Sequence, residues 1–488
     1  MIDVVTQQSF LKVDLWALGA VMALSAGAML LLLLEFIPQR ENGNRGPIVS
    51  LLSLAAAAWS VWHVHDVKRS LFGGMFVHDG VTVYLTLLFC TITAISVLLS
   101  WDYVKRTKIN QAEFYALLLC ATIGMIVMSG SNDLVTIFIG LELMSLALYV
   151  LVGFRRSRLE STEASLKYFL LGAFSTGFLL YGIALLYGAT GTTNLTTMGA
   201  FLIESPLKNT LLVAGGLLVL TGFAFKIAAV PFHMWTPDAY EGAPTTVTGY
   251  MSVGAKAAAF AALLRFGLTA MAAMHVDWRP VLTALAIATM TVGNVAALMQ
   301  DNMKRMLAYS SIAHAGYVLV AVVAGGAAGT SAALFYLTTY SLMNLGAFGL
   351  LSVLGRDREE RVYIADLRGL GFRQPVLGIA MAIFMLSLGG IPPLAGFMGK
   401  IYVFGAAMDA GLVPLVIVGV LNSVVSIFYY LRVTVAMYMQ EPQGEATPVS
   451  WTWASALAVM VALVLTLFWG VAGNSLLVQA QQSVARIL

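Results

Sequence analysis

The chain has 488 residues, of which 59% are hydrophobic and only 10% are charged. Soluble domains carry about 25% charged residues, so this composition excludes a soluble enzyme and indicates a polytopic membrane protein in contact with lipid. The net charge of +3 is spread along the chain without a basic stripe, which argues against nucleic acid as a partner.

The first apolar run, 15–37, is too long for a signal-peptide core and ends without a small-residue cleavage site. We therefore expect a retained membrane helix. Further apolar runs of about 18 to 25 residues, bounded by charges, glycine or proline, bring the expected total to about fourteen helices. The expected bounds are 15–37, 47–64, 79–101, 112–129, 133–153, 164–187, 209–231, 245–268, 280–299, 303–325, 330–354, 375–404, 411–439 and 451–472. The predicted fold class is all-α and polytopic.

Proline interrupts two of these runs in mid-membrane, at Pro231 in "FKIAAVPFHMW" and at Pro392 and Pro393 in "LSLGGIPPLAGFMGKIYVF". Proline removes a backbone donor, and in hydrocarbon the freed carbonyls need other partners. The two breaks are five spans apart, and an odd shift inverts the second copy in the membrane. This pattern is typical of inverted-topology repeats, whose broken helices mark a transport path. For either break alone, a kink without function is the simpler alternative.

We therefore divide the chain into four parts. Residues 1–111 form an N-terminal three-helix segment, and 112–268 form the first five-helix repeat. Residues 269–440 form the second, inverted repeat, and 441–488 form the last helix and a tail. Each repeat contains one broken helix.

Four ionisable residues lie well inside the expected helices: Glu142, Lys226, Lys256 and Lys400. A charge in mid-bilayer is costly and usually faces the bundle interior or a hydrated cavity. A lysine whose carboxylate partner approaches or withdraws is a switchable proton site, and we expect Glu142 and Lys226 to be such partners. The alternative is that these residues snorkel to an interface or form a static pair.

Two histidines add to this set. His314, in "AYSSIAHAGYVLV", lies in the tenth expected helix, and an ordinary imidazole pKa of about 6.5 suits a relay between Lys256 and Lys400. A hydrogen-bonded packing histidine fits the same pattern equally well. His233 borders the first break and is a candidate for proton uptake.

The two cysteines, Cys90 and Cys120, both fall in apolar runs without a second Cys or a His at metal-ligand spacing. They predict helix packing rather than a disulfide framework, a metal site or an iron–sulfur cluster. The sequence also has no phosphate-cradling glycine loop, so we expect this chain to bind no cofactor.

The positively charged residues set the expected orientation. Lys and Arg gather in the odd-numbered connections, for example at 105–108, at 155–158 and between 355 and 375. By the positive-inside rule these connections face the cytoplasm, which places both termini on the outer side of the membrane.

The stretch "FKIAAVPFHMWTPDAYEGAPTTVTGYMSVGAKAA" resembles the signature of the antiporter-like membrane subunits of respiratory complex I, an NADH-quinone oxidoreductase. "DNMKRMLAYSSIAHAGY" and "LSLGGIPPLAGFMGKIYVF" are similar to two other signatures of that family, and the resemblance covers essentially the whole chain. Three features separate it from the M-type and L-type members and favour the remaining branch. They are the glycine in "YEGAPT", a lysine at Lys400 where the M-type has glutamate, and an end soon after the last helix, without the L-type lateral helix.

The resemblance implies that Glu142, Lys226, Lys256 and Lys400 translocate protons, driven by quinone reduction elsewhere in the complex. NADH, FMN, iron–sulfur clusters and quinone would belong to other subunits, and the partners would be the other membrane subunits in a bacterial inner membrane. The alternatives are a subunit of a multisubunit sodium/proton antiporter, the membrane arm of a hydrogenase complex, and a purely structural spacer between other membrane subunits.

Overall fold

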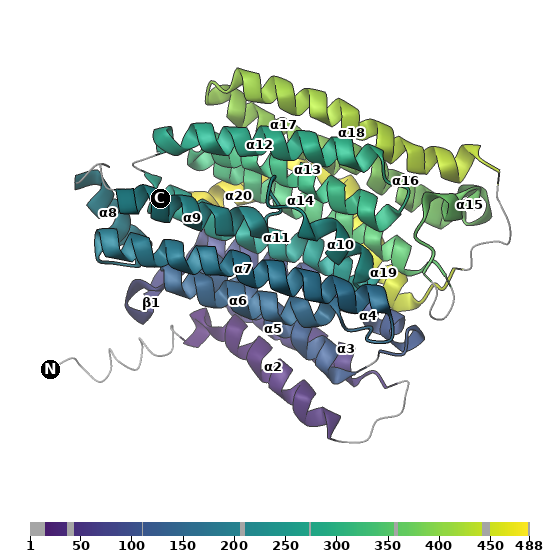
Figure 1. Cartoon of the computed structure of the whole chain (residues 1–488). Helices are drawn as coiled ribbons and strands as arrows, with labels where there is room; N and C mark the ends of the chain where they lie inside the picture. The colour runs from purple at the N-terminus through teal and green to yellow at the C-terminus, as the bar shows by residue number, and fades with distance from the viewer. Residues whose placement is uncertain are drawn as a thin grey trace.

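The computed structural model of the chain describes residues 15–36, 43–109, 111–204, 210–272, 275–355, 360–441 and 449–486. In these ranges the chain forms a bundle of long helices that lie side by side, in rough chain order from α2 to α18 (Figure 1). Within the described residues, eleven helices are long and apolar enough to cross a membrane, and the shorter apolar helices include α2, α9 and α16. The expected all-α polytopic fold is confirmed. Residues 1–14 of the expected N-terminal segment, and Arg356 and Arg358 among the basic connections, lie outside the described residues.

The first half of the bundle contains long helices separated by short connections. They are α2 (Gly19–Glu35), α3 (Arg45–His63), α4 (Gly80–Arg106), α5 (Ala112–Gly130), α6 (Leu134–Val152), α7 (Leu159–Thr190), α9 (Thr210–Lys226) and α11 (Thr245–Leu268). Two short helices, α8 (Leu195–Glu204) and α10 (Trp235–Gly242), flank α9. The sequence did not predict either one, because both are shorter than a membrane span.

The second half of the bundle also consists of long helices joined by short connections. It contains α12 (His275–Leu298), α13 (Met303–Ala324), α14 (Gly326–Ser352), α15 (Leu370–Arg373), α16 (Pro375–Gly389), α17 (Ala395–Asp409), α18 (Val413–Met439), α19 (Trp453–Val471) and α20 (Gly473–Ala485). The expected twelfth helix is two helices, α16 and α17, which meet at the second break. The helix α20 was not expected, because a polar stretch after the last apolar run reads as a tail.

The bundle has two distinct ends. At one end, β1 (Arg69–Leu71) and β2 (Phe76–His78) form an antiparallel hairpin. Phe76 of this hairpin also forms an isolated β-bridge with Ser131, just after α5. The C-terminal helix reaches the same end, where Arg486 forms an ion pair with Asp66 at 2.8 Å. We call this the hairpin end, and we call the opposite end, where the connection after α14 lies, the Glu360 end. Which end faces the cytoplasm stays a prediction from the charges.

The first break lies between α9 and α10 and contains the cis Val230–Pro231 bond. Its freed backbone groups are bound by side chains from elsewhere. The Trp235 indole donates to the carbonyl of Phe225 at 3.0 Å, and the amide of Val230 donates to the Thr289 hydroxyl on α12 at 3.0 Å. A helix break inside the membrane is tolerated only where the freed backbone groups find hydrogen-bond partners. Here α10 and α12 supply these partners and so stabilise the first break.

The second break lies between α16 and α17 and contains the cis Pro392–Pro393 bond. The last carbonyl of α16, that of Gly389, accepts a hydrogen bond from the Lys400 ammonium at 2.8 Å. The amide of Gly396, near the start of α17, donates to the Ser387 hydroxyl at 3.1 Å. Here too, side chains replace the missing helical partners.

The two broken helices run in opposite directions. The chain enters α9 from α8, which adjoins the hairpin end through the Asp133–Asn194 bridge, and it enters α16 from the Glu360 end. This antiparallel relation agrees with the expected inversion. The boundaries of the four predicted segments themselves stay a prediction.

Helices α5 and α6 approach each other closely at a pair of glycines. A Cβ atom on Gly124 would lie 2.6 Å from the carbonyl oxygen of Gly140, and a Cβ on Gly140 would lie 2.9 Å from that of Gly124. Small residues permit such crossings in membranes. The contact fixes the position of α6, which carries Glu142.

We expect Gly124→Ala to lower the apparent Tm of the detergent-solubilised protein, because overpacking costs roughly 1–3 kcal/mol. Thermal unfolding followed by tryptophan fluorescence measures this. Gly177→Ala on α7 is the matched control, because nothing lies within 4 Å of its added Cβ. Equal Tm values for the two variants would contradict the role of the crossing.

Candidate functional site

Lys226, the last residue of α9, is buried with 3% of its surface exposed. Its ammonium donates to the Ser145 hydroxyl at 2.8 Å and to the Tyr149 hydroxyl at 3.2 Å, and it lies 5.4 Å from the centre of the Tyr149 ring. Both partners are on α6, three and seven residues after Glu142, so they share its side of the helix. The first lysine is thus held by hydroxyl groups.

The expected partner of Lys226, Glu142, does not touch it. Among the described residues, the Lys226 ammonium binds Ser145 and Tyr149 and forms no ion pair with Glu142, although Glu142 acts on it electrostatically. Glu142 is half-buried, and its Oε1 is buried without a hydrogen-bond partner in this part of the chain. In this structure the two groups are therefore near each other but not paired.

Lys256 lies in the middle of α11, with 3% of its surface exposed. Its ammonium donates to two oxygens of Ser311 on α13, the carbonyl at 2.8 Å and the hydroxyl at 2.7 Å. The ring of Tyr240, on α10, has its centre 5.9 Å from the same ammonium. The environment again offers dipoles and an aromatic face, which favour a cation without neutralising it.

Lys400 lies on α17, just after the second break, with 4% of its surface exposed. Besides the Gly389 carbonyl, its ammonium binds the Ser423 hydroxyl on α18 at 2.7 Å. The centre of the Tyr317 ring is 5.1 Å away. An ammonium at the end of α16 also interacts favourably with the helix dipole.

His314 lies on α13 with 2% of its surface exposed. Its Nδ1 lies 2.8 Å from the hydroxyl of Tyr336 and its Nε2 lies 3.0 Å from that of Tyr430. Both Lys256 and Lys400 act on it electrostatically. On α13 the histidine lies between Ser311, which binds Lys256, and Tyr317, whose ring faces Lys400, and both of its ring nitrogens are hydrogen-bonded. This geometry fits the predicted relay and also fits a packing histidine.

One side of α13 connects the second and third lysines. Ser311 holds Lys256, His314 follows one turn later, and the Tyr317 ring faces Lys400. Across the bundle the lysine-bearing helices lie in the order α9, α11 and α17, with α13 near the middle (Figure 1). The structure thus places Lys256, His314 and Lys400 along one side of α13, with Lys226 on α9 beyond α11, and we call these three lysines with His314 the row.

His233, the predicted uptake residue, is half-buried in the connection between α9 and α10. Its Nδ1 is buried and has no hydrogen-bond partner among the described residues. Its position beside the first break is as expected, and its role stays a prediction.

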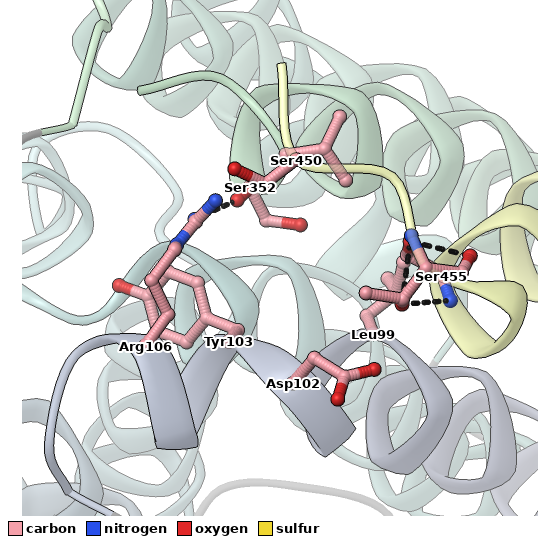
Figure 2. Close-up of a pocket in the computed structure, with 9 residues that line it drawn as sticks. Leu99, Asp102, Tyr103, Arg106, Ser352, Ser450 and Ser455 are labelled. Atoms are coloured by element: carbon pink, nitrogen blue, oxygen red, sulfur yellow. Dashed lines mark hydrogen bonds between the residues drawn. The ribbon is translucent and has the colours of Figure 1, made fainter. Parts of the chain in front are cut away.

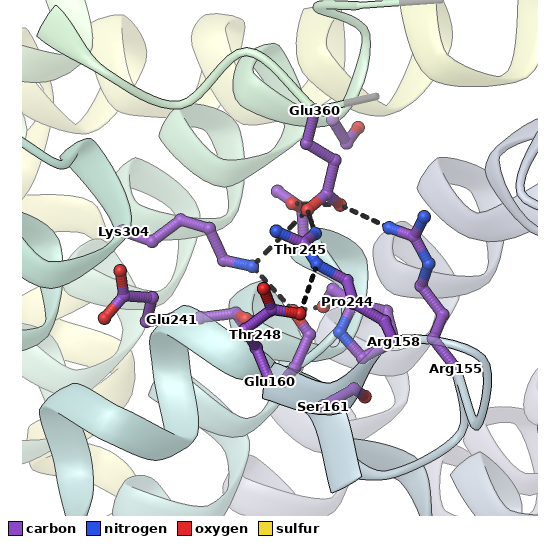
Figure 3. A network of polar contacts seen from close by, with 12 residues as sticks. Arg155, Arg158, Glu160, Ser161, Glu241, Pro244, Thr245, Thr248, Lys304 and Glu360 are labelled. Carbon is purple, nitrogen blue, oxygen red and sulfur yellow. Dashed lines mark hydrogen bonds and ion pairs between the residues drawn. The ribbon is translucent and has the colours of Figure 1, made fainter. Parts of the chain in front are cut away.

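Sequence reasoning missed a buried charge cluster at the Glu360 end (Figure 3). The Glu360 side chain, 5% exposed, accepts hydrogen bonds from Arg158 at 2.9 Å, from Thr245 at 2.8 Å and from the Tyr103 hydroxyl. The ammonium of Lys304 lies 3.8 Å from it, and the guanidinium of Arg155 lies 3.7 Å from it. These residues come from connections far apart in sequence, so spacing gives no signal for the cluster.

The cluster keeps Glu360 ionised. Burial alone would raise the pKa of the carboxyl, but Lys304, the Tyr103 hydroxyl and Arg155 outweigh it and lower the pKa from 4.5 to about 2. Glu360 therefore acts as a fixed negative charge at all physiological pH values.

A second buried ion pair closes the hairpin end. Asp79 caps α4 by accepting from the amide of Thr82, and it receives two guanidinium hydrogen bonds from Arg265 at 2.7 and 3.0 Å. Burial raises the pKa of Asp79, but Arg265 lowers it further, so that the net shift is downward. Asp79 and Arg265 thus neutralise each other, in contrast to the lysines in the middle.

A small cavity of about 150 Å³ lies between the end of α4 and the start of α19 (Figure 2). Tyr103, Arg106, Asp102 and Ser450 are among its lining residues, and Arg106 donates to the carbonyl of Ser352. No predicted proton-holding residue lines it. The cavity borders the Glu360 cluster through Tyr103 and is separate from the row of lysines.

Possible metal ligands do not gather anywhere in the part of the chain that the structure describes: no group of three or more His, Cys, Asp or Glu side chains could hold an ion. The two cysteines are free thiols, and Cys90 is buried.

The fold and the row define an antiporter-like membrane subunit with two broken helices and three buried lysines. Residues 131–426 match the family described as NADH:quinone oxidoreductase/Mrp antiporter, TM. A relative from Trichlorobacter lovleyi, named NADH-quinone oxidoreductase subunit N, is 46% identical over 99% of this chain and 100% of its own length. The chain belongs to this family of membrane subunits.

Two solved structures have the same fold as this chain. A chain of respiratory complex I from Thermus thermophilus is 38% identical, with a TM-score of 0.80 over 94% of this chain and 98% of that one. A chain of the Mrp complex from Dietzia sp. DQ12-45-1b has a TM-score of 0.85 over 96% of this chain and 97% of that one. At 22% identity, the second likeness concerns the fold alone.

We expect Glu360→Gln to destabilise the protein by about 3–5 kcal/mol, because it leaves buried cations without their counter-ion. The pKa of Glu360 is lowered in the folded state, so its contribution is complete above pH 4.5 and is lost as pH falls toward about 2. Tm measured from pH 6 to pH 3 should therefore fall less steeply in the variant.

The control is Glu163→Gln on α7, whose side chain is 56% exposed and pairs with Lys167. An exposed pair contributes about 0–1 kcal/mol, so this variant should follow the wild-type curve. Identical acid slopes for wild type and Glu360→Gln would contradict the assignment.

Proposed function

We propose that this chain is the N subunit of a bacterial NADH-quinone oxidoreductase and that it carries protons across the membrane. The row of three buried ammonium groups supports this most directly. A structural ion would be neutralised by a carboxylate, whereas Lys226, Lys256 and Lys400 are held by hydroxyls, carbonyls and aromatic rings. Such a group is stabilised when charged and can still release its proton.

The proposed order follows the row. A change of charge in a neighbouring subunit alters the interaction of Glu142 with Lys226, which changes the proton affinity of Lys226 and then of Lys256. His314 passes the proton on toward Lys400, from which it leaves to the outer side. His233, beside the first break at Pro231, contributes to uptake, and the breaks at Pro231 and at Pro392–Pro393 let water and charge reach the row.

The remaining assignments follow from this role. NADH, FMN, iron–sulfur clusters and quinone belong to other subunits, and no redox step takes place in this chain. Its partners are the other membrane subunits of the complex and the surrounding lipid. The chain lies in the bacterial inner membrane with the Glu360 end toward the cytoplasm, because the basic connections gather there, and with both termini on the outer side.

We expect Lys226→Ala and Lys256→Ala each to reduce redox-driven proton pumping by on the order of tenfold or more, because each removes a proton carrier. The measurement is the number of protons moved per electron in inverted membrane vesicles, with assembly checked by co-purification. Lys167→Ala is the matched control, because this lysine is 47% exposed at the rim of α7.

An undiminished proton-to-electron ratio in both variants would overturn the proposal. Cation-dependent proton exchange in membranes without any quinone reductase would instead support an antiporter subunit. If neutralising all four charges left pumping intact in the assembled complex, the chain would be a structural spacer.

We expect His314→Phe to slow pumping and His314→Gln to retain part of it. The Gln side chain can keep the hydrogen bonds to Tyr336 and Tyr430, and the Phe side chain cannot. Neither Phe nor Gln takes up a proton near neutral pH. Equal, unimpaired pumping in both variants would assign the histidine to packing.

A further inference from the structure

The Glu360 carboxylate joins parts of the chain that belong to both expected repeats. Its donors are Tyr103 on α4, Arg155 and Arg158 in the connection before α7, Thr245 at the start of α11 and Lys304 at the start of α13. A buried anion among so many donors is far more than a loop needs in order to be held in place. We therefore ask which part of the chain the Glu360 carboxylate holds in position.

We propose that Glu360 is a positioning residue for the proton-holding Lys256 and that it acts through Lys304 and the junction between α10 and α11. This inference rests on the proposed function, in which Lys256 carries a proton. It adds a residue outside the row that sets the geometry and the electrostatic field of the row.

Lys304 connects Glu360 to the junction between α10 and α11. Lys304 is 1% exposed, lies 3.8 Å from Glu360 and donates to the carbonyl of Ala243 at 2.6 Å. Ala243 is the residue at which α10 ends. The ammonium therefore binds the carboxylate and the end of α10 at the same time (Figure 3).

The start of α11 is bound to Glu360 as well. The Thr245 hydroxyl donates to Glu360 at 2.8 Å, and the Thr245 amide donates to the Tyr103 hydroxyl, which itself donates to Glu360. One turn further, the Thr248 hydroxyl donates to the carbonyl of Tyr240 at 2.9 Å. The end of α10 and the start of α11 are thus bound to each other and to one anion.

The junction in turn contacts Lys256 through Tyr240. Tyr240, held by this junction, places its ring over Lys256, and the Ser311 hydroxyl that binds Lys256 lies 3.5 Å from the Tyr240 hydroxyl. Lys256 itself is on α11, about 16 Å along the helix from Thr245 at 1.5 Å per residue. A shift of the junction would therefore move both Tyr240 and Lys256.

The charge balance gives a second effect. Glu360 offsets Lys304, Arg155 and Arg158, and Glu160 pairs with Arg158 at the rim. Among the described residues, the titratable groups near Lys256 include Tyr240, Tyr340, His233 and His314, and none of these four is an anion at neutral pH. Without Glu360, the cations at this end would oppose the arrival of a proton at Lys256.

The experiment compares Glu360→Gln and Glu360→Asp in the assembled complex in inverted vesicles. Electron transfer and proton pumping are measured from pH 6 to pH 9. We expect Glu360→Gln to lower the proton-to-electron ratio and to move the alkaline limit of pumping downward by roughly half to one pH unit. Glu360→Asp should restore the limit, because it keeps the charge. Glu163→Gln is the matched control, a carboxylate on the rim of the same end.

Lys304→Met alone should also lower the proton-to-electron ratio, which tests the proposal even where Glu360→Gln does not assemble, and the double variant Glu360→Gln/Lys304→Met tests the coupling of the two residues. If Glu360 acts through Lys304, the double variant should lose no more pumping than the worse single variant. Additive losses would overturn the proposal. So would a uniform loss of amplitude in Glu360→Gln without a pH shift, since that is the result of a purely structural role.

The Lys256→Ala variant separates this inference from the proposed function. If Lys256→Ala pumps normally, the proposed function fails. If Lys256→Ala is impaired while Glu360→Gln pumps with an unchanged pH limit, only the positioning role fails.

Discussion

The constraint on which this structure depends is the cost of an ammonium ion in hydrocarbon. A charge in mid-bilayer costs several kcal/mol unless the protein solvates it. Lys226, Lys256 and Lys400 share one solution, in which a serine hydroxyl and a second oxygen bind the ammonium beside a tyrosine ring. Helix α6 supplies the oxygens for Lys226, α13 supplies those for Lys256, and the second break and α18 supply those for Lys400.

The ends of the bundle treat charge differently. At the hairpin end Asp79 and Arg265 neutralise each other, and at the Glu360 end a carboxylate meets several cations. Paired ions of this kind resist titration, because each stabilises the charged form of the other. The middle holds cations with neutral dipoles, which leaves protonation open to change. The molecule thus combines rigid, paired ends with a titratable centre.

The sequence predicted the helices, the two breaks and the residues of the row, because long apolar runs, proline and rare intramembrane charges are local signals. It did not predict the partners of the lysines. Ser145 and Tyr149 follow Glu142 at helical spacing, so a signal for them existed, but Ser423 and Tyr240 reach their lysines only through tertiary packing. Glu360 could not be found at all, since its donors come from four separate segments. The expected pairing of Glu142 with Lys226 shows the same limit. The sequence indicates that the two residues have opposite charges, but only the fold determines how far apart they lie.

The opposed directions of the two half-helices α9 and α16 bear on the response to membrane potential. Each ends inside the membrane with the negative pole of its dipole, equivalent to roughly half an elementary charge. Because the helices enter from opposite faces, an electric field across the bilayer does nearly equal and opposite work on them. The interrupted backbone is therefore almost indifferent to voltage as a pair, and the work of the field falls on the mobile protons instead.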